Sequence, residues 1–185
     1  MITVVSGLPR SGTSMMMQIL QAGGLQALCD HERSPDENNP RGYFEYQKVR
    51  SLATDNTWLA EAEGKSIKVV SQLLYHLPPH FEYRVIFMRR DLREVLRSQE
   101  RMLASLGAAD ETQQNAMVEH FTRHLEGLEL WLGKQPNFQV FPCNYSEVVA
   151  DPLRLAPPIS RFLGILLDPE RMASVVDPDL YRQRL

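Results

Sequence analysis

The 185-residue sequence lacks most of the features that mark specialised classes of protein. No apolar run approaches the roughly 20 residues of a membrane-spanning helix, so no membrane partner is expected. Only two cysteines, Cys29 and Cys143, are present, and their wide separation matches no metal-binding or redox spacing. We interpret them as reduced thiols of a cytoplasmic protein. The first predicted strand begins at Ile2, so we expect no cleaved targeting peptide.

A strong charge of one sign is missing as well. The formal net charge is −3 at pH 7, and the composition, with 43% hydrophobic and 23% charged residues, is that of an ordinary globular protein. Nucleic acid is therefore not an expected partner, and any anionic ligand must be bound by locally placed cations. The length suits a single domain over residues 1–185, while the oligomeric state stays open.

What the sequence does contain is an alternation of short apolar runs and helix-like segments. Strands are predicted at 2–6, 66–70, 83–88 and 138–143, and helices at about 14–22, 43–53, 92–106 and 111–134, followed by helical segments broken at 157–158 and 168–169. Strands separated by helices indicate a parallel sheet that is covered on both faces. We predict a three-layer α/β/α fold with a central parallel sheet, P-loop NTPase-like, and a site at the carboxyl ends of the strands.

The segment GLPRSGTS, residues 7–14, lies between the first predicted strand and the first helix. It has the glycine spacing of a phosphate-binding loop, but Thr13 stands where such a loop normally carries a lysine. Backbone N–H groups of the turn and the positive helix N-terminus form a cradle for an anion. Arg10 supplies a cation from inside the loop, and Thr13 and Ser14 supply hydroxyl donors. The alternative interpretation is a turn that merely starts a helix.

A second basic element follows the third predicted strand, where MRRD places Arg89 and Arg90 before any carboxylate. Hydrolysis of a nucleoside triphosphate on this fold calls instead for a lysine on the β- and γ-phosphates and an acidic residue that helps to hold Mg²⁺. Arginines at a strand end suit an anion better than a metal. We therefore predict a site for two separate anionic groups, without a metal ion.

Both segments resemble the cofactor-binding signatures of the sulfotransferase family. GLPRSGTS is similar to the family's 5′-phosphosulfate loop, with arginine where cytosolic members use lysine. VIFMRRDLREVLRSQ resembles the 3′-phosphate signature, in which a strand-end arginine precedes a serine by eight residues, as Arg90 precedes Ser98. The resemblance implies 3′-phosphoadenosine-5′-phosphosulfate (PAPS) as the donor. It implies that the cofactor-binding residues are Pro9, Arg10, Ser11, Gly12, Thr13, Ser14, Arg90 and Ser98.

Other segments extend this resemblance, and two features depart from it. Lys68 in SIKVV resembles the family lysine near the bridging oxygen, and Tyr145 in CNYSEVVADP resembles the tyrosine that lies beside the adenine. NNPRGYFE and VDPDLYRQR resemble segments of small bacterial sulfotransferase-like proteins. However, Val70 stands where cytosolic members have a histidine base, and their C-terminal glycine-rich segment has no counterpart here.

The resemblance implies an enzyme that transfers a sulfuryl group from PAPS to a hydroxyl or amine of a small-molecule acceptor. Such a reaction needs a base for the acceptor proton and cations that stabilise charge on the leaving phosphate. We expect Glu45 to be the base, since GYFE places it at a predicted loop-to-helix entry with aromatic neighbours. Arg10 and Lys68 are the expected cations. The remaining candidates for the base are Asp30, Glu32 and His76, followed by His31.

Two other functions remain open at this stage. One is a small-molecule kinase that uses ATP on the same fold, although Thr13 replaces the lysine that it would need. The other is a sulfotransferase-like module that binds the nucleotide without catalysis. The sequence does not name the acceptor, whose pocket we expect residues 29–63 to line.

Overall fold

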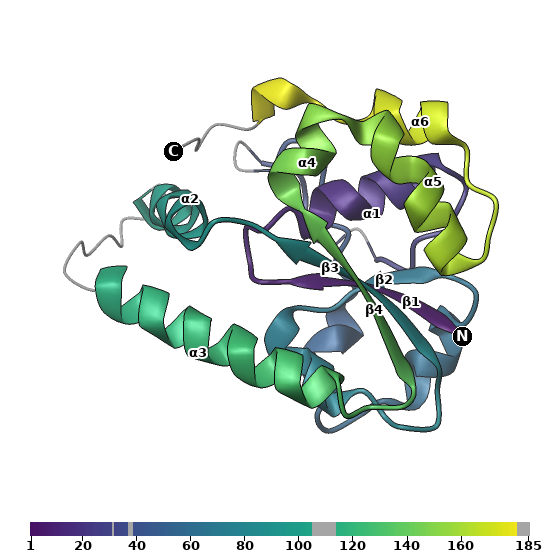
Figure 1. Cartoon of the computed structure of the whole chain (residues 1–185). Helices are drawn as coiled ribbons and strands as arrows, with labels where there is room; N and C mark the ends of the chain where they lie inside the picture. The colour runs from purple at the N-terminus through teal and green to yellow at the C-terminus, as the bar shows by residue number, and fades with distance from the viewer. Residues whose placement is uncertain (31, 37–38, 105–113, 181–185) are drawn as a thin grey trace.

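The computed structural model describes residues 1–30, 32–36, 39–104 and 114–180. Its centre is a sheet of four parallel strands in the order β2-β1-β3-β4 (Figure 1). Their bounds are Ile2–Gly7 for β1, Ser66–Lys68 for β2, Tyr83–Arg89 for β3 and Phe138–Asn144 for β4. The predicted parallel sheet is confirmed, and all of its carboxyl ends lie at one edge.

Helices cover both faces of this sheet (Figure 1). On one face lie α1 (Thr13–Ala22), α4 (Tyr145–Ala150), α5 (Pro152–Leu163) and α6 (Pro169–Ser174). The other face carries α3 (Gln114–Leu132) and the 3-10 helices η1 (Gln47–Ser51), η2 (Thr57–Ala62) and η3 (Ser71–His76). Two further elements, α2 (Leu92–Ala104) and η5 (Pro178–Leu180), complete the described chain. None of the described helices combines the length and the apolarity that crossing a membrane would require.

Alternating side chains of the strands create one apolar core on each face. Val4 and Val85 belong to the core under α3, whereas Val5 and Ile86 belong to the core under α1. All four side chains are fully buried. This period of two follows from the pleat of a strand, which points successive side chains to opposite faces. The sheet is thereby fixed between two helical layers, and its carboxyl edge is held in a constant position.

The structure corrects two of the predicted helical boundaries. The helix expected over 43–53 is wrong, because only η1 is helical and Phe44 has a φ of 52°, outside the helical range. The break expected at 157–158 is also wrong, because α5 continues through Pro157 and Pro158. Leu153 and Arg154, whose carbonyls lose their helical partners there, are exposed, so water can bind these carbonyls.

Other boundaries agree with the sequence prediction. The break at 168–169 is confirmed, since α6 begins there and the Asp168 side chain caps it by accepting from the N–H groups of Glu170 and Arg171 at 3.0 Å. The C-terminal end expected for α2 and the start expected for α3 fall on residues 105–113, outside the described part of the chain.

Candidate functional site

A cavity of about 460 Å³ opens at the carboxyl edge of the sheet. Each strand contributes to it, through the loop after β1, Lys68 at the end of β2, Arg90 after β3 and Tyr145 after β4. Its lining includes all predicted site residues except Ser11, namely Pro9, Arg10, Gly12, Thr13, Ser14, Glu45, Lys68, Arg90, Ser98 and Tyr145. Residues from distant parts of the chain therefore meet in one place, at the edge where the fold predicts a ligand.

The loop between β1 and α1 needs glycine at its second glycine position. Gly12 has a φ of 99°, which side chains rarely tolerate, and a Cβ atom there would lie 2.5 Å from Cδ2 of Tyr145. Within the described residues, no side chain caps the N-terminus of α1, and its first turn contains no acidic residue. The unpaired N–H groups of that turn, together with the hydroxyls of Thr13 and Ser14 in the cavity lining, can therefore serve an anion.

Ser11 is the predicted site residue that the structure places elsewhere. Its N–H donates to the carbonyl of Leu8 at 3.1 Å, and its side chain is buried behind the loop, outside the cavity lining. The Ser11 hydroxyl finds no hydrogen-bond partner within the described residues. Ser11 thus shapes the turn, and its expected contact with the cofactor gains no support from this position.

Arg10 adopts an unusual backbone conformation that its contacts stabilise. Its φ of 71° lies in the left-handed region, which costs a residue other than glycine about 1–2 kcal/mol. Its Nε donates to Oγ of Ser98 at 2.9 Å, and its carbonyl accepts from Nη1 of Arg90 at 3.2 Å. Burial, with a smaller effect of Arg90, lowers the pKa of the Arg10 guanidinium. Arg10 therefore connects the loop to the residues predicted for the 3′-phosphate.

Arg90 is held by a buried ion pair that sequence reasoning missed. Its Nε donates to Oε2 of Glu94 at 2.9 Å, and the two side chains are only 7% and 6% exposed. The Cζ atom lies 4.3 Å from the ring centroid of Tyr145. The i,i+4 spacing of Arg90 and Glu94 was the available signal. Arg89 instead forms an ion pair with Glu129 of α3, so the two neighbouring arginines have different partners.

Lys68, the last residue of β2, lines the cavity and is 9% exposed. Its Nζ donates to the Tyr43 carbonyl and lies 3.4 Å from both Oγ of Ser14 and Oε1 of Glu45. Burial lowers the pKa of the Lys68 ammonium, and the nearby Glu45 carboxylate opposes this shift. The predicted lysine, hydroxyl and carboxylate are thus neighbours.

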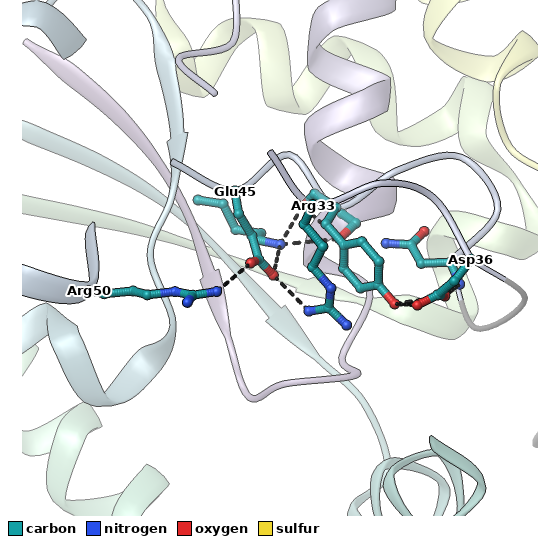
Figure 2. A network of polar contacts seen from close by, with 8 residues as sticks. Arg33, Asp36, Glu45 and Arg50 are labelled. Atoms are coloured by element: carbon teal, nitrogen blue, oxygen red, sulfur yellow. Dashed lines mark hydrogen bonds and ion pairs between the residues drawn. The ribbon is translucent and has the colours of Figure 1, made fainter. Parts of the chain in front are cut away.

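Glu45 contacts three cations (Figure 2). Besides Lys68, Nη1 of Arg33 lies 3.3 Å from Oε1, and Nη2 of Arg50 lies 3.4 Å from Oε2. The aromatic setting expected for Glu45 is therefore not what the structure shows. Its neighbours in sequence, Phe44 and Tyr46, pack against the two cores on opposite sides of the sheet.

Asp30, Glu32 and His76 do not belong to the cavity lining, and His31 lies outside the described residues. Asp30 serves a turn, because its carboxylate accepts from the N–H of Glu32 at 3.2 Å and from the N–H of Gln47. His76 is exposed at the end of η3. Among the candidates for the base that the structure describes, Glu45 is the one that lines the cavity.

The segment between α1 and η1 also brings side chains that sequence reasoning left without a role. The guanidinium of Arg33 stacks on the ring of Tyr43, with Cζ 3.3 Å from the centroid. The Tyr43 hydroxyl donates to the carboxylate of Asp36 at 2.7 and 2.8 Å. Burial and this hydrogen bond raise the pKa of Tyr43 to about 12. These contacts position Arg33 beside Glu45.

A contact between distant segments closes one side of the cavity. Nη2 of Arg41 lies 3.1 Å from Oδ2 of Asp177, and Nη1 donates to the Val175 carbonyl. Val175, Asp177 and Leu180 all belong to the cavity lining. The C-terminal segment therefore takes part in the site, which local sequence patterns did not indicate.

Comparison with known proteins identifies the family. The model of the sulfotransferase domain matches residues 2–178. Among solved structures, a sulfotransferase domain from the curacin biosynthetic pathway is similar, with 14% identity, a TM-score of 0.56, and coverage of 100% of this chain and 91% of that one. Sulfotransferase STF1 from Mycobacterium tuberculosis H37Rv has 18% identity and a TM-score of 0.57, with coverage of 95% and 70%.

A third similar structure is mouse sulfotransferase SULT7A1 complexed with PAP, with 18% identity, a TM-score of 0.52, and coverage of 95% of this chain and 62% of that one. A search of curated protein sequences found no significant match. At these identities the solved structures show the fold alone, and they confirm the predicted α/β arrangement. Because the family match spans residues 2–178, the chain belongs to the sulfotransferase family.

Proposed function

We propose that this protein transfers a sulfuryl group from PAPS to a hydroxyl or amine of a small-molecule acceptor and releases adenosine 3′,5′-bisphosphate. One observation carries the proposal. Arg10, Ser98, Arg90 and Tyr145 form a connected cluster in the same cavity as the open N-terminus of α1. A cluster of arginines, an open helix N-terminus and an aromatic ring in one cavity support an adenine nucleotide with two anionic groups as the ligand.

The residues fit the donor as follows. Arg90 and Ser98 would hold the 3′-phosphate, because both have polar groups beside Arg10 in a largely buried cluster. The ring of Tyr145 would lie beside the adenine. Thr13, Ser14 and the first N–H groups of α1 would hold the 5′-phosphosulfate. Glycine at position 12 supports this assignment, since a side chain there would collide with Tyr145.

The reaction is assigned to three residues that line the same cavity, Glu45, Lys68 and Arg10. Glu45 takes the proton of the acceptor hydroxyl or amine while its oxygen or nitrogen attacks the sulfur. A new bond to sulfur forms, and the bond between sulfur and the bridging oxygen breaks in line with it. The electron pair of the broken bond stays on the bridging oxygen, where Lys68 and Arg10 would stabilise its charge. The products are a sulfated acceptor and adenosine 3′,5′-bisphosphate.

Ligand-dependent melting tests this proposal. Adenosine 3′,5′-bisphosphate should raise the melting temperature of the protein without added metal, and EDTA should change this effect little. ATP with Mg²⁺ serves as the comparison. A larger increase with ATP and Mg²⁺, or a strict requirement for Mg²⁺ in bisphosphate binding, would favour the kinase and overturn the sulfotransferase assignment.

Turnover separates the enzyme from an inactive binding module. With PAPS and a panel of small hydroxyl- and amine-containing acceptors, release of adenosine 3′,5′-bisphosphate should depend on the acceptor. Binding of the bisphosphate without any acceptor-dependent release would support the inactive module instead.

A further inference from the structure

The surroundings of Glu45 contain more positive charge than the proposed reaction uses. One carboxylate is in contact with Lys68, Arg33 and Arg50, so this group of four residues carries two surplus positive charges. Lys68 is assigned to the bridging oxygen of the donor. Arg33 and Arg50 then face one carboxylate, so together they carry one positive charge more than is needed to compensate the base.

Nor does the donor account for these two arginines. Its 3′-phosphate is assigned to Arg90 and to Ser98 of α2. Its 5′-phosphosulfate is assigned to Thr13, Ser14 and the first N–H groups of α1. Arg33 comes from the segment after α1 and Arg50 from η1, and Figure 2 shows both pointing at the Glu45 carboxylate from different sides. Both arginines line the cavity.

Arg33 and Arg50 are also accessible to a ligand. Their side chains are 42% and 72% exposed, whereas Lys68 is nearly buried. Each makes a contact to Glu45 that is longer than 3.2 Å, at 3.3 and 3.4 Å, where charge-assisted hydrogen bonds are usually shorter. A guanidinium has five N–H donors in a planar fork that matches carboxylate and phosphate oxygens. Either fork can therefore bind an anion while Glu45 remains beside it.

We propose that the acceptor of this sulfotransferase is itself anionic, carrying a carboxylate or phosphate group that Arg33 and Arg50 bind next to the reacting hydroxyl or amine. This inference rests on the proposed function and adds the chemical class of the acceptor. The arrangement gives each group its own role: the arginines fix the anionic end of the acceptor, and Glu45 lies between them and Lys68 to receive the proton. A neutral hydrophobic acceptor would leave both guanidinium groups without this ligand.

Matched probe pairs test the proposal by NMR titration in the presence of saturating adenosine 3′,5′-bisphosphate, which blocks the donor site. The pairs are hydroxyphenylacetate and its amide, hydroxybutyrate and its amide, and glycerol phosphate and glycerol. In at least one pair the anionic member should bind about 10-fold or more tightly than its neutral partner. Raising the salt concentration should reduce this difference.

Three variants locate the binding site. Arg50→Gln and Arg33→Gln should each weaken binding of the preferred anion by about 5-fold or more. Lys48→Gln is the matched control, because Lys48 lies on the same short helix as Arg50, is exposed, forms an ion pair with Glu61 and is not part of the cavity lining. It should leave anion binding unchanged. Arg50→Gln is the decisive variant, because the Arg50 side chain is largely exposed and its replacement should change the stability of the fold little.

Several results would overturn the proposal. Equal binding within every pair, no binding of any anionic probe at millimolar concentration, or an equal effect of Lys48→Gln and Arg50→Gln would each do so. Bisphosphate binding, measured in the same samples, distinguishes failure of the acceptor class from failure of the proposed function. If the bisphosphate binds and no anion preference appears, only the acceptor class is wrong. If the bisphosphate does not bind, the proposed function fails and the acceptor assignment fails with it.

Discussion

At the scale of single residues, the site is a chain of contacts between charged side chains from separate segments. Ser98 accepts from Arg10, the carbonyl of Arg10 accepts from Arg90, and Glu94 holds Arg90 through a buried ion pair. Breaking a buried pair by removing one partner leaves an uncompensated charge, which is costly. Glu94 would therefore act on a ligand through Arg90, by fixing the position of its guanidinium.

The first prediction concerns Arg90 and the 3′-phosphate. Arg90→Ala should weaken binding of adenosine 3′,5′-bisphosphate by roughly 1.5–3 kcal/mol, because a charge-assisted contact is lost. Adenosine 5′-phosphosulfate lacks the 3′-phosphate and should be affected little. Arg89→Ala is the control, since Arg89 pairs with Glu129 of α3 and does not line the cavity. Calorimetric titration of both nucleotides measures this, and equal weakening of the two would rule out Arg90 as a 3′-phosphate ligand.

The contact between Arg10 and Ser98 gives a second prediction. Since the two side chains share a hydrogen bond of 2.9 Å, their alanine substitutions should be non-additive in bisphosphate binding. A double-mutant cycle by calorimetry should show a coupling of about 0.5 kcal/mol or more. Additive effects would mean that Arg10 turns away from Ser98 when the nucleotide binds.

Glu45 carries the third prediction. Glu45→Gln should reduce kcat by about 100-fold or more, because the amide cannot accept the acceptor proton, while affinity for the bisphosphate stays nearly unchanged. Glu61→Gln is a suitable control, since Glu61 is an exposed ion-pair partner of Lys48 outside the cavity lining. Steady-state kinetics with any active acceptor decides the question. A variant with near-normal kcat would return the role of base to Asp30, Glu32 or His76.

At the scale of secondary structure, the critical element is the β1 strand with its loop and α1. The strand ends at the cavity, the loop turns through Gly12, and the helix presents its uncapped N-terminus to the site. The ring of Tyr145, at the start of α4, packs against Gly12 and occupies the space that a side chain at position 12 would need. The loop before α1 and the start of α4, more than 130 residues apart in sequence, are therefore in contact at Gly12.

Gly12→Ala tests this arrangement. The new Cβ atom would lie 2.5 Å from the Tyr145 ring on a backbone with a φ of 99°, so we expect a lower melting temperature and loss of bisphosphate binding. The control is Gly127→Ala in α3, where a Cβ atom meets nothing within 4 Å and the backbone is helical. It should stabilise the protein by about 0.5–1 kcal/mol through helix propensity, without an effect on binding. Thermal melting and titration of both variants give the comparison, and an unimpaired Gly12→Ala protein would contradict it.

At the scale of the whole molecule, two apolar cores on the two faces of the sheet hold the site in place. Cys143 of β4 belongs to the core under α1 and α5, and its side chain is almost fully buried. Burial is the main cause that raises the pKa of this thiol to about 12, from an ordinary value of 9.0, and the nearby Glu147 adds to the shift. The folded protein therefore keeps the thiol neutral at a pH where the unfolded chain ionises it.

This difference predicts a loss of stability in alkaline solution. The contribution of Cys143 is fully present below pH 9 and is lost as the pH rises from about 9 toward about 12. The free energy of unfolding should fall by up to about 1.4 kcal/mol per pH unit from this group alone. Cys143→Ala should lower stability at pH 7 through a small cavity but make the alkaline decrease shallower. Urea denaturation between pH 7 and pH 10 measures both, and identical slopes in the two proteins would show that Cys143 is not responsible.

The sequence alone determined the parallel sheet and the position of the loop, and it predicted Arg90 rather than Arg89 as a residue of the site. These features depend on local patterns, namely apolar runs of strand length, glycine spacing, and the eight residues between Arg90 and Ser98. The spacing of residues in such patterns follows from the periodicity of strands and helices, so the patterns can be recognised without knowledge of distant contacts.

Only the tertiary structure decided the setting of Glu45 and the closure of the cavity. Arg33 and Arg50 approach Glu45 from two separate segments, and Arg41 reaches Asp177 across 136 positions of sequence. The same packing buries Ser11 behind the loop, although its sequence neighbours line the cavity. Contacts of this kind depend on how loops and helices pack around the sheet, and residue spacing does not encode the direction in which an irregular segment points its side chains.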